Sequence, residues 1–320
     1  MEHESLNPPV KKTSWKPFII AMSACAVLAA ALFILNMTGS SFHGDYIGQL
    51  YITGEISQSS SGGYDHSFLL DKIESMENDP SNQGILLYVD SPGGTVYESD
   101  EMYNALLRYK ENTGCPVYAY MANTAASGAL YISMAADRIA ANRMTTTGSI
   151  GVIMSSSDFT GLYDKLGIKT YQITSGKHKA MLSGNNDEQT LEEDISILQR
   201  MVDEYYGYFV NVISTSRDIP NEQVRQFADG RTFTATQARD LGLIDEVLGY
   251  DDAVNDFYQK NNIPPSTQVR DFVAPSPSLW DSFFSKVPSS KKESSSSLPE
   301  LLMQQLEAPE ALFLPEETQP

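Results

Sequence analysis

Basic residues are scarce in this sequence. Its 320 residues include 22 Lys and Arg against 41 Asp and Glu, which gives a formal net charge of -19. An acidic chain of this kind does not attract phosphate backbones or an anionic membrane surface, so we expect no nucleic-acid partner. The simplest interpretation of the acidity is the solubility of an exposed domain.

Cysteine and histidine are also few, and they are not spaced as metal ligands. Cys25 lies inside an apolar run, and Cys115 precedes a strand-like segment. No metal-ligand spacing is present, and the Gly-Lys-Ser/Thr ending of a nucleotide-binding loop is missing. His66 and His178 could serve a histidine-based triad, but neither stands in a recognisable motif. We therefore expect no metal and no cofactor.

One long apolar run is present near the N-terminus. Phe18 to Leu35 is interrupted only by Ser23, and a helix of this length spans roughly 27 Å, close to the hydrocarbon thickness of a bilayer. Three lysines precede the run: Lys11, Lys12 and Lys16. The positive-inside rule then predicts a cytoplasmic segment at 1–17, a transmembrane anchor in contact with lipid at 18–37 and a linker at 38–43. A cleaved signal peptide is the competing interpretation.

The rest of the chain divides into a folded domain at 44–262 and a flexible tail at 263–320. Nine of the 16 prolines follow residue 263, together with the serine run 294–297, and this composition is typical of a tail. In the domain, strand-like and helix-like patterns alternate, which predicts an α/β fold. The expected strands are 46–56, 85–89, 117–121, 139–141 and 243–247, and the expected helices are 68–76, 96–109, 126–135, 159–166, 188–214 and 234–241.

Ser127 is the first candidate catalytic residue. It lies between small residues, in Ala125-Ala126-Ser127-Gly128, at the start of a predicted helix. The small neighbours leave room for a substrate carbonyl, and the Gly128 N–H could stabilise the oxyanion that forms on attack. The alternative is an ordinary helix-capping serine.

Gly94 and Lys179 are the other candidates. Gly94 ends the sequence Asp90-Ser91-Pro92-Gly93-Gly94 after a buried strand, where bare backbone N–H groups could face an oxyanion or simply form a turn. Lys179 follows Ser127 by 52 positions, and the apolar residues after it make partial burial plausible. A lysine acts as a base only when it is neutral, which requires partial desolvation at neutral pH. A solvated loop lysine is the alternative, and Lys177 is the competing candidate.

Taken together, these motifs resemble the bacterial signal peptide peptidase A family in its short, single-repeat form. The resemblance covers about 44–250. It depends on the order of five short blocks: 90–99, 125–133, 147–153, 175–179, and 229–231 with 242–245. One difference from the family pattern is Ala129, where a second glycine is common.

The resemblance implies a Clp/crotonase-like fold and a membrane-bound serine endopeptidase that degrades signal-peptide remnants. In this interpretation Ser127 is the nucleophile and Lys179 the general base. Gly94 and Gly128 form the oxyanion hole, and Ser149 orients Lys179. The resemblance further implies homo-oligomeric rings with active sites shared between protomers. The lysines before the apolar run predict that the protein lies at the cell membrane with the catalytic domain outside the cytoplasm.

Two other functions remain open from the sequence. A membrane scaffold would use the peptide groove for binding and would tolerate the loss of Ser127 and Lys179. A crotonase-type acyl-CoA enzyme would not need the lysine, and the acidic domain lacks a basic patch for its nucleotide. The apolar islands in the tail, among them Leu312-Phe313-Leu314, suggest that the tail occupies a hydrophobic peptide groove, its own or a neighbour's, and is trimmed there. The alternative is a passive, disordered tail.

Overall fold

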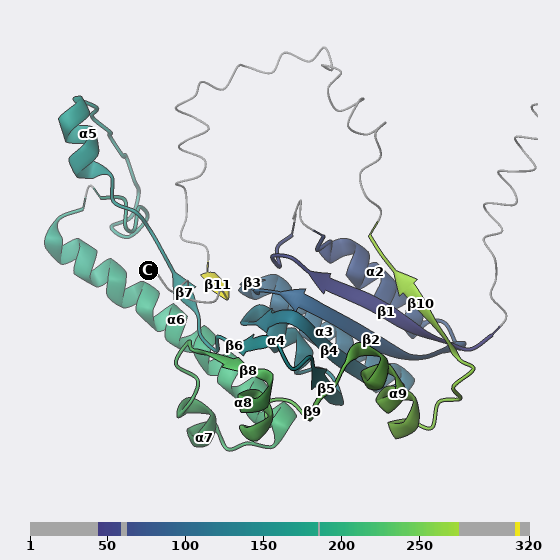
Figure 1. The fold of residues 1–320 in the computed structure, drawn as a ribbon. Helices are drawn as coiled ribbons and strands as arrows, with labels where there is room; N and C mark the ends of the chain where they lie inside the picture. Colours follow the sequence, from purple (N-terminus) through teal and green to yellow (C-terminus); the bar gives the residue numbers. More distant parts are fainter. Residues whose placement is uncertain (1–43, 59–62, 185, 275–310, 314–320) are drawn as a thin grey trace, which may run out of the picture. The chain divides into compact units, whose positions relative to one another are not determined.

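The computed structural model of the chain describes residues 44–58, 63–184, 186–274 and 311–313 (Figure 1). The anchor predicted at 18–37 lies outside these residues. Within them, no helix is both long and apolar enough to cross a membrane.

A mixed β-sheet forms the centre of the fold, in the order β10-β1-β2-β4-β5-β9. Its strands are β1 (Tyr46–Thr53), β2 (Asn82–Ser91), β4 (Val117–Ala126), β5 (Arg138–Ala141), β9 (Glu246–Val247) and β10 (Gln268–Phe272). All of these pairs are parallel. Two short strands extend the sheet at the end of β4: β6 (Thr146–Gly148) pairs with β4 in parallel, and β8 (Thr232–Thr234) pairs with β6 in antiparallel.

Helices cover both faces of this sheet (Figure 1). The helices of the described residues are α2 (His66–Glu77), α3 (Val96–Thr113), α4 (Gly128–Ser133), α5 (Thr160–Leu166), α6 (Glu188–Arg217), α7 (Asn221–Arg225), α8 (Ala235–Asp240) and α9 (Tyr250–Lys260), of which α5 and the first half of α6 project away from the sheet. Leu87 of β2 belongs to the larger core, with Leu106 and Phe209, whereas its neighbour Leu86 packs with Phe257 of α9 in a smaller core. Successive strand residues point to opposite faces, so both faces are buried, as is usual for parallel sheets.

A second, three-stranded sheet lies beside the first. It contains β3 (Gly94–Thr95), β7 (Ile153–Met154) and β11 (Ala311–Phe313), with β11 in the centre and antiparallel to both neighbours. The chain enters β3 directly from β2 and leaves it into α3. The second sheet therefore begins at the carboxyl end of a central strand of the first.

The α/β class predicted from the alternating pattern is confirmed. Two strands, β10 and β11, lie where the sequence predicted the flexible tail, and β10 pairs with β1 along its length. Pro264 and Pro265, which precede β10, belong to the proline-rich composition from which the tail was predicted. Phe272 packs against the larger core and Val269 against the smaller one, and these contacts hold β10 on the sheet.

Candidate active site

Ser127 lies at a sharp turn between a strand and a helix. It follows the last residue of β4 and precedes the first of α4, with φ 54° and ψ -121°. Positive φ is uncommon for a residue with a side chain, and this strained conformation persists only where neighbouring groups enforce it. Two hydrogen bonds do so: the Ser127 N–H donates to the Gly148 carbonyl at 2.8 Å, and the Ser127 carbonyl accepts from the Tyr131 N–H at 2.9 Å.

The Ser127 hydroxyl is buried and has no hydrogen-bond partner among the described residues. The alternative role considered from the sequence was helix capping, but the side chain makes no capping hydrogen bond to α4. Buried polar groups are normally satisfied, so an unpaired one calls for an explanation. A hydroxyl that awaits a substrate and a base provides one.

Gly94 and Gly128 converge near this hydroxyl. A Cβ atom built on Gly128 would lie 3.4 Å from the Gly94 nitrogen and 2.3 Å from the Ser99 Oγ, which itself donates to the Thr95 carbonyl. A Cβ on Gly94 would lie only 1.9 Å from the Ile56 carbonyl oxygen. The close approach of these backbones requires glycine at both positions.

Ser149 is also next to Ser127. In the parallel pair of β4 and β6, Ala126 is opposite Gly148, so the residues that follow them are neighbours. Ser149 is buried, adopts φ 52° and donates its N–H to the Arg231 carbonyl at 2.9 Å. The structure thus brings together four of the five residues named from the sequence: Ser127, Gly94, Gly128 and Ser149.

Lys179 does not join them within one chain. It lies in the loop between α5 and α6, and its side chain is exposed, contrary to the expected burial. Because the Ser127 hydroxyl has no partner among the described residues, no Ser127–Lys179 hydrogen bond forms within the protomer. Lys177 is also exposed, and its ammonium is paired with the Glu193 carboxylate of α6. This interaction lowers the pKa of Glu193.

The segment that carries Lys179 projects from the sheet. We call residues 153–201 the arm; it comprises β7, α5, the Lys179 loop and the first half of α6 (Figure 1). Of the 14 large hydrophobic side chains that are exposed in the described residues, ten belong to the arm: Ile153, Phe159, Leu162, Leu166, Ile168, Tyr171, Ile173, Leu191, Ile195 and Met201. No residue of α5 is buried. An apolar surface of this extent is typical of an interface between proteins.

Strand β11 of the tail lies directly beside Gly94. Phe313 pairs with Gly94 and Leu312 with Thr95, while Leu312 and Ala311 pair with Ile153 and Met154 on the other side. An extended segment therefore fits between β3 and β7 by adding a strand, which is how many proteins bind peptides. Strands β3 and β7 are too short to show an alternating hydrophobic pattern, so they could not be predicted from the sequence.

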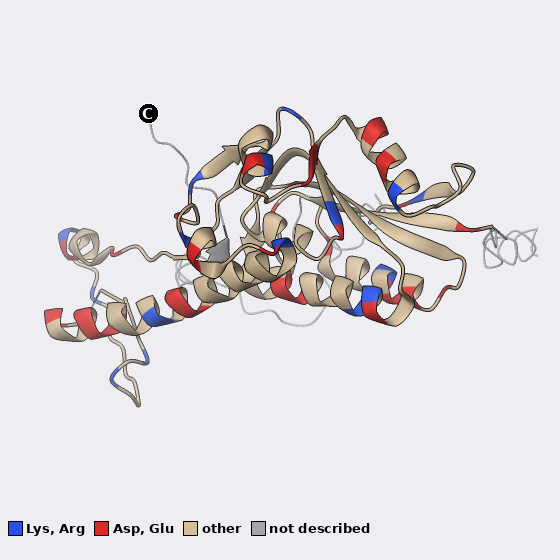
Figure 2. Cartoon of the chain, turned by 90° about the horizontal axis from the view of Figure 1, so that it is seen from below, with Lys and Arg blue, Asp and Glu red and all other residues tan. Residues whose placement is uncertain are grey.

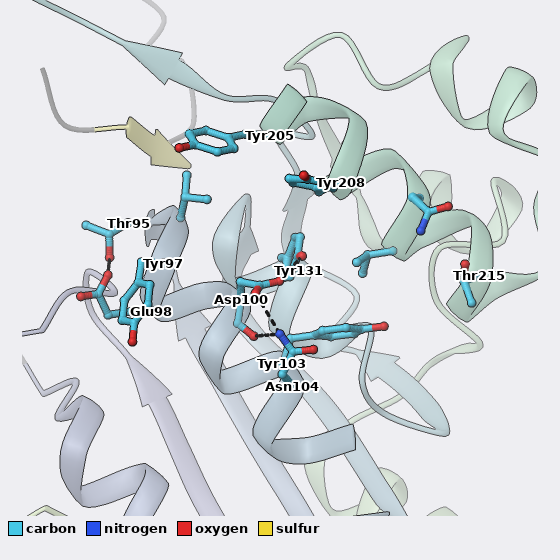
Figure 3. Close-up of a pocket in the computed structure, with 13 residues that line it drawn as sticks. Thr95, Tyr97, Glu98, Asp100, Tyr103, Asn104, Tyr131, Tyr205, Tyr208 and Thr215 are labelled. Atoms are coloured by element: carbon cyan, nitrogen blue, oxygen red, sulfur yellow. Dashed lines mark hydrogen bonds between the residues drawn. The ribbon is translucent and has the colours of Figure 1, made fainter. Parts of the chain in front are cut away.

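A cavity of about 790 Å³ opens next to β3, between α3, α4 and α6 (Figure 3). Five tyrosines line it: Tyr97, Tyr103, Tyr131, Tyr205 and Tyr208. The Tyr131 hydroxyl donates to Asp100 at 2.6 Å, and burial, together with this carboxylate, raises the pKa of Tyr131. Acidic and basic residues are spread over the helices, with acidic residues at the projecting end of α6 (Figure 2).

Two further charged clusters lie outside the site. His66 contacts Tyr64 and Glu101 at 2.8 and 2.7 Å, which accounts for its burial without any role at Ser127. His178 contacts Asp194 at 2.6 Å. Among the described residues, no cluster of His, Cys, Asp or Glu has the arrangement of a metal site.

Comparison with known proteins places this geometry in context. The profile described as peptidase family S49 matches residues 109–263. The Synechocystis protein "Putative protease slr0021" is 38% identical over 65% of this chain and 71% of its own length. The Enterococcus faecium "Putative signal peptide peptidase SppA" is 36% identical over 68% of this chain, and the match spans 62% of that protein's length. "Serine protease SPPA, chloroplastic" of Arabidopsis thaliana is 34% identical over 67% of this chain and 31% of its own length.

Among solved structures, a mutant of the 1510-N membrane-bound stomatin-specific protease aligns with a TM-score of 0.48 and 15% identity, over 73% of this chain and all of that one. A mutant of ClpP1 from Listeria monocytogenes aligns with a TM-score of 0.44 and 17% identity, over 64% and 94% of the two chains.

Proposed function

Because the chain belongs to peptidase family S49, the family of the signal peptide peptidase A proteins that its motifs resemble, we propose that it is a membrane-anchored serine endopeptidase. Its nucleophile is Ser127, and its general base is Lys179. Its substrates are extended apolar peptides, of which cleaved signal peptides are the representative class.

The observation that carries this proposal is the state of Ser127. Its hydroxyl is buried and unpaired among the described residues, at a strained turn, beside two glycines whose backbones approach each other closely. A scaffold has no need for such strain. In a hydrolase, the turn presents the hydroxyl to a carbonyl carbon, and the adjacent N–H groups receive the oxygen.

The reaction proceeds by acyl transfer. The Ser127 oxygen attacks the peptide carbonyl while neutral Lys179 takes the hydroxyl proton, and the N–H groups of Gly94 and Gly128 hold the tetrahedral oxyanion. The Lys179 ammonium then gives its proton to the departing amine, which leaves an acyl-enzyme. Water, deprotonated by Lys179, attacks that ester and releases the second product with Ser127 restored.

Lys179 reaches Ser127 from a neighbouring copy of the chain. Within one protomer Lys179 is exposed on the arm, and the apolar side chains around it have no covering among the described residues. Docking of the arm on a neighbour would bury these side chains and would also remove the lysine from water. Desolvation favours the neutral form of a lysine, which is the form that a base requires.

The apolar substrate class follows from the groove between β3 and β7. The described strand there pairs through its backbone with both neighbours, so the groove accepts extended chain of varied sequence. The tyrosine-lined cavity adjoins the same strand and offers apolar contact to side chains. The predicted anchor at 18–37 would hold this groove near peptides that remain in the membrane.

Mixing two inactive variants tests the shared site. Ser127→Ala and Lys179→Ala are each expected to be inactive on an internally quenched apolar peptide. After subunit exchange, random pairing should restore roughly a quarter of the wild-type rate at equal amounts, because only a Ser127-intact chain beside a Lys179-intact neighbour is complete. A mixture as inactive as its parts would contradict the shared site, and full activity of either variant alone would contradict the peptidase.

The proposed location places the catalytic domain outside the cytoplasm. A membrane-impermeant thiol reagent should label Glu188→Cys, an exposed position at the start of α6, in intact cells. A Cys115→Ser background removes the one native cysteine in the described residues. Labelling that requires cell lysis would reverse the predicted orientation.

A further inference from the structure

The loop that carries Lys179 is attached to α6 by one buried carboxylate, Asp194. The Asp194 side chain has no exposed surface. Its Oδ1 lies 2.6 Å from Nδ1 of His178, and its Oδ2 accepts a hydrogen bond from the Asn186 side-chain amide at 2.8 Å. Buried carboxylates are rare unless they are paired, and here both partners come from the loop.

These contacts hold the chain on both sides of Lys179. His178 is the residue immediately before it. On the other side, the amide of Asn186 that donates to Asp194 also donates to the Ala180 carbonyl at 3.2 Å. The backbone of Lys179 is thus fixed between two anchored neighbours, while its own side chain projects into solvent.

A second link between the same loop and the same helix provides a comparison. Lys177 is paired with Glu193, but these side chains are 51% and 40% exposed, whereas those of His178 and Asp194 are 34% and 0% exposed. Exposed ion pairs contribute little to stability because water competes for both charges. Glu193 also lies 3.5 Å from Nε2 of His178, so His178 faces two acidic groups.

We propose that Asp194, through His178 and Asn186, is a positioning residue that presets Lys179 for catalysis. The inference rests on the proposed role of Lys179 as the base. A long lysine side chain has many conformers, and a base must meet its nucleophile within hydrogen-bond reach. Fixing the backbone at Lys179 leaves only the side chain to be ordered when the arm meets a neighbouring copy, and this lowers the entropy lost on forming the site.

The test compares three variants of the full chain with wild type. Asp194→Ala removes the shared acceptor, His178→Gln replaces the imidazole with a more flexible amide, and Lys177→Gln is the matched control that breaks the exposed pair. Because Lys179 acts in the chemical step, Asp194→Ala should lower kcat about tenfold or more with KM within about twofold. His178→Gln should lower kcat by a smaller factor, and Lys177→Gln should change neither constant.

Hydrogen exchange supplies a readout that does not depend on activity. Amides in 175–186 should exchange faster in Asp194→Ala and His178→Gln than in wild type. In Lys177→Gln the same amides should exchange at the wild-type rate, and amides of the central sheet should be unchanged in every variant. Asp194→Asn keeps the shape and one acceptor, so it should recover part of the lost kcat. If Asp194→Ala does not fold, Asn186→Ala decides the question in its place.

Lys179→Ala, measured in parallel, separates the two ideas. Activity in Lys179→Ala would overturn the proposed base itself. Inactive Lys179→Ala together with wild-type kcat in folded Asp194→Ala, or in Asn186→Ala where Asp194→Ala does not fold, would overturn the positioning role alone. A fall in kcat without faster exchange in 175–186 would also overturn it, as would an equal fall in the Lys177→Gln control.

Discussion

The described residues outside the arm, which we call the sheet domain, differ from the arm in how much of their surface is buried within one chain. In the sheet domain, Ser127 and Ser149 are buried next to each other, held in strained conformations by backbone hydrogen bonds. In the arm, Lys179 and a series of large apolar side chains face solvent. One part is a preorganised half-site, and the other has the character of a surface that awaits a partner. The difference fits the proposed mechanism, in which folding positions Ser127 as the nucleophile and assembly supplies Lys179 as its base.

The largest expected effect comes from removing either half of the pair. Ser127→Ala and Lys179→Ala should each lower turnover of an apolar peptide by at least about 10⁴-fold, since removing one member of a catalytic unit removes nearly all of its effect. Lys179→Arg should be equally inactive, because a guanidinium does not become a neutral base. Lys177→Ala should retain most activity. The opposite pattern at the two lysines would show that the base was assigned wrongly.

Chemical labelling tests Ser127 as the nucleophile. A fluorophosphonate should modify wild type and leave Ser127→Ala unlabelled, with circular dichroism unchanged between them. Unchanged peptide turnover by folded Ser127→Ala would refute the nucleophile.

The second expected effect concerns the oxyanion donors. Gly94→Ala would place a Cβ 1.9 Å from the Ile56 carbonyl oxygen, so the backbone at Gly94 must move. Loss of one such donor typically lowers kcat about 10²–10³-fold. Gly207→Ala is the control, because a Cβ there meets nothing within 4 Å. Alanine inside a helix such as α6 is more stable than glycine by about 1 kcal/mol. Steady-state kinetics and thermal unfolding on both variants should show lost activity in the first and slightly raised stability in the second.

The sequence predicted the sheet domain better than the arm, for physical reasons. Ser127, Gly94 and Gly128 lie at the ends of strands whose apolar runs are evident, and neighbouring parallel strands bring their ends together. Lys179 follows no such rule, because its position depends on a loop and, in the proposed assembly, on contacts with a neighbouring copy. Asp194 carried no signal, since it is 16 positions from His178 and looks like any acidic residue of a helix.

The core end of α6 provides a stability test that should leave the arm unaffected. Arg217 makes two hydrogen bonds to the Asp245 carboxylate, at 2.8 and 3.1 Å, and Asp245 also accepts from the Ile139 N–H at 2.7 Å. Burial by itself would raise the pKa of Asp245, but Arg217 and the Ile139 N–H outweigh it and lower that pKa below its ordinary value. Asp245→Asn should therefore lower the free energy of unfolding by about 2 kcal/mol at pH 7.

The lowered pKa of Asp245 predicts how the stability difference between wild type and Asp245→Asn changes with pH. A carboxyl whose pKa is lower in the folded state stabilises the fold above its unfolded pKa of about 4, and that contribution disappears as the pH falls through the folded value. Denaturant unfolding should show a gap between wild type and Asp245→Asn that is full at pH 7 and closes below about pH 4. A gap that does not depend on pH would indicate lost packing in place of the ion pair.

The smallest expected effect concerns the tail, whose strand β11 pairs with a strand of each region. Strand β11 lies between β3 of the sheet domain and β7 of the arm, in the position that we propose for a substrate strand. A tethered segment has a high effective concentration, so we expect it to compete with added peptide and to be cut there. Deleting residues 298–320 should raise kcat/KM a few-fold by removing that competitor. Intact mass should reveal a shortened C-terminus in wild type and full length in Ser127→Ala. Full-length masses in both, together with unchanged kinetics after the deletion, would leave the tail without a role as substrate or inhibitor.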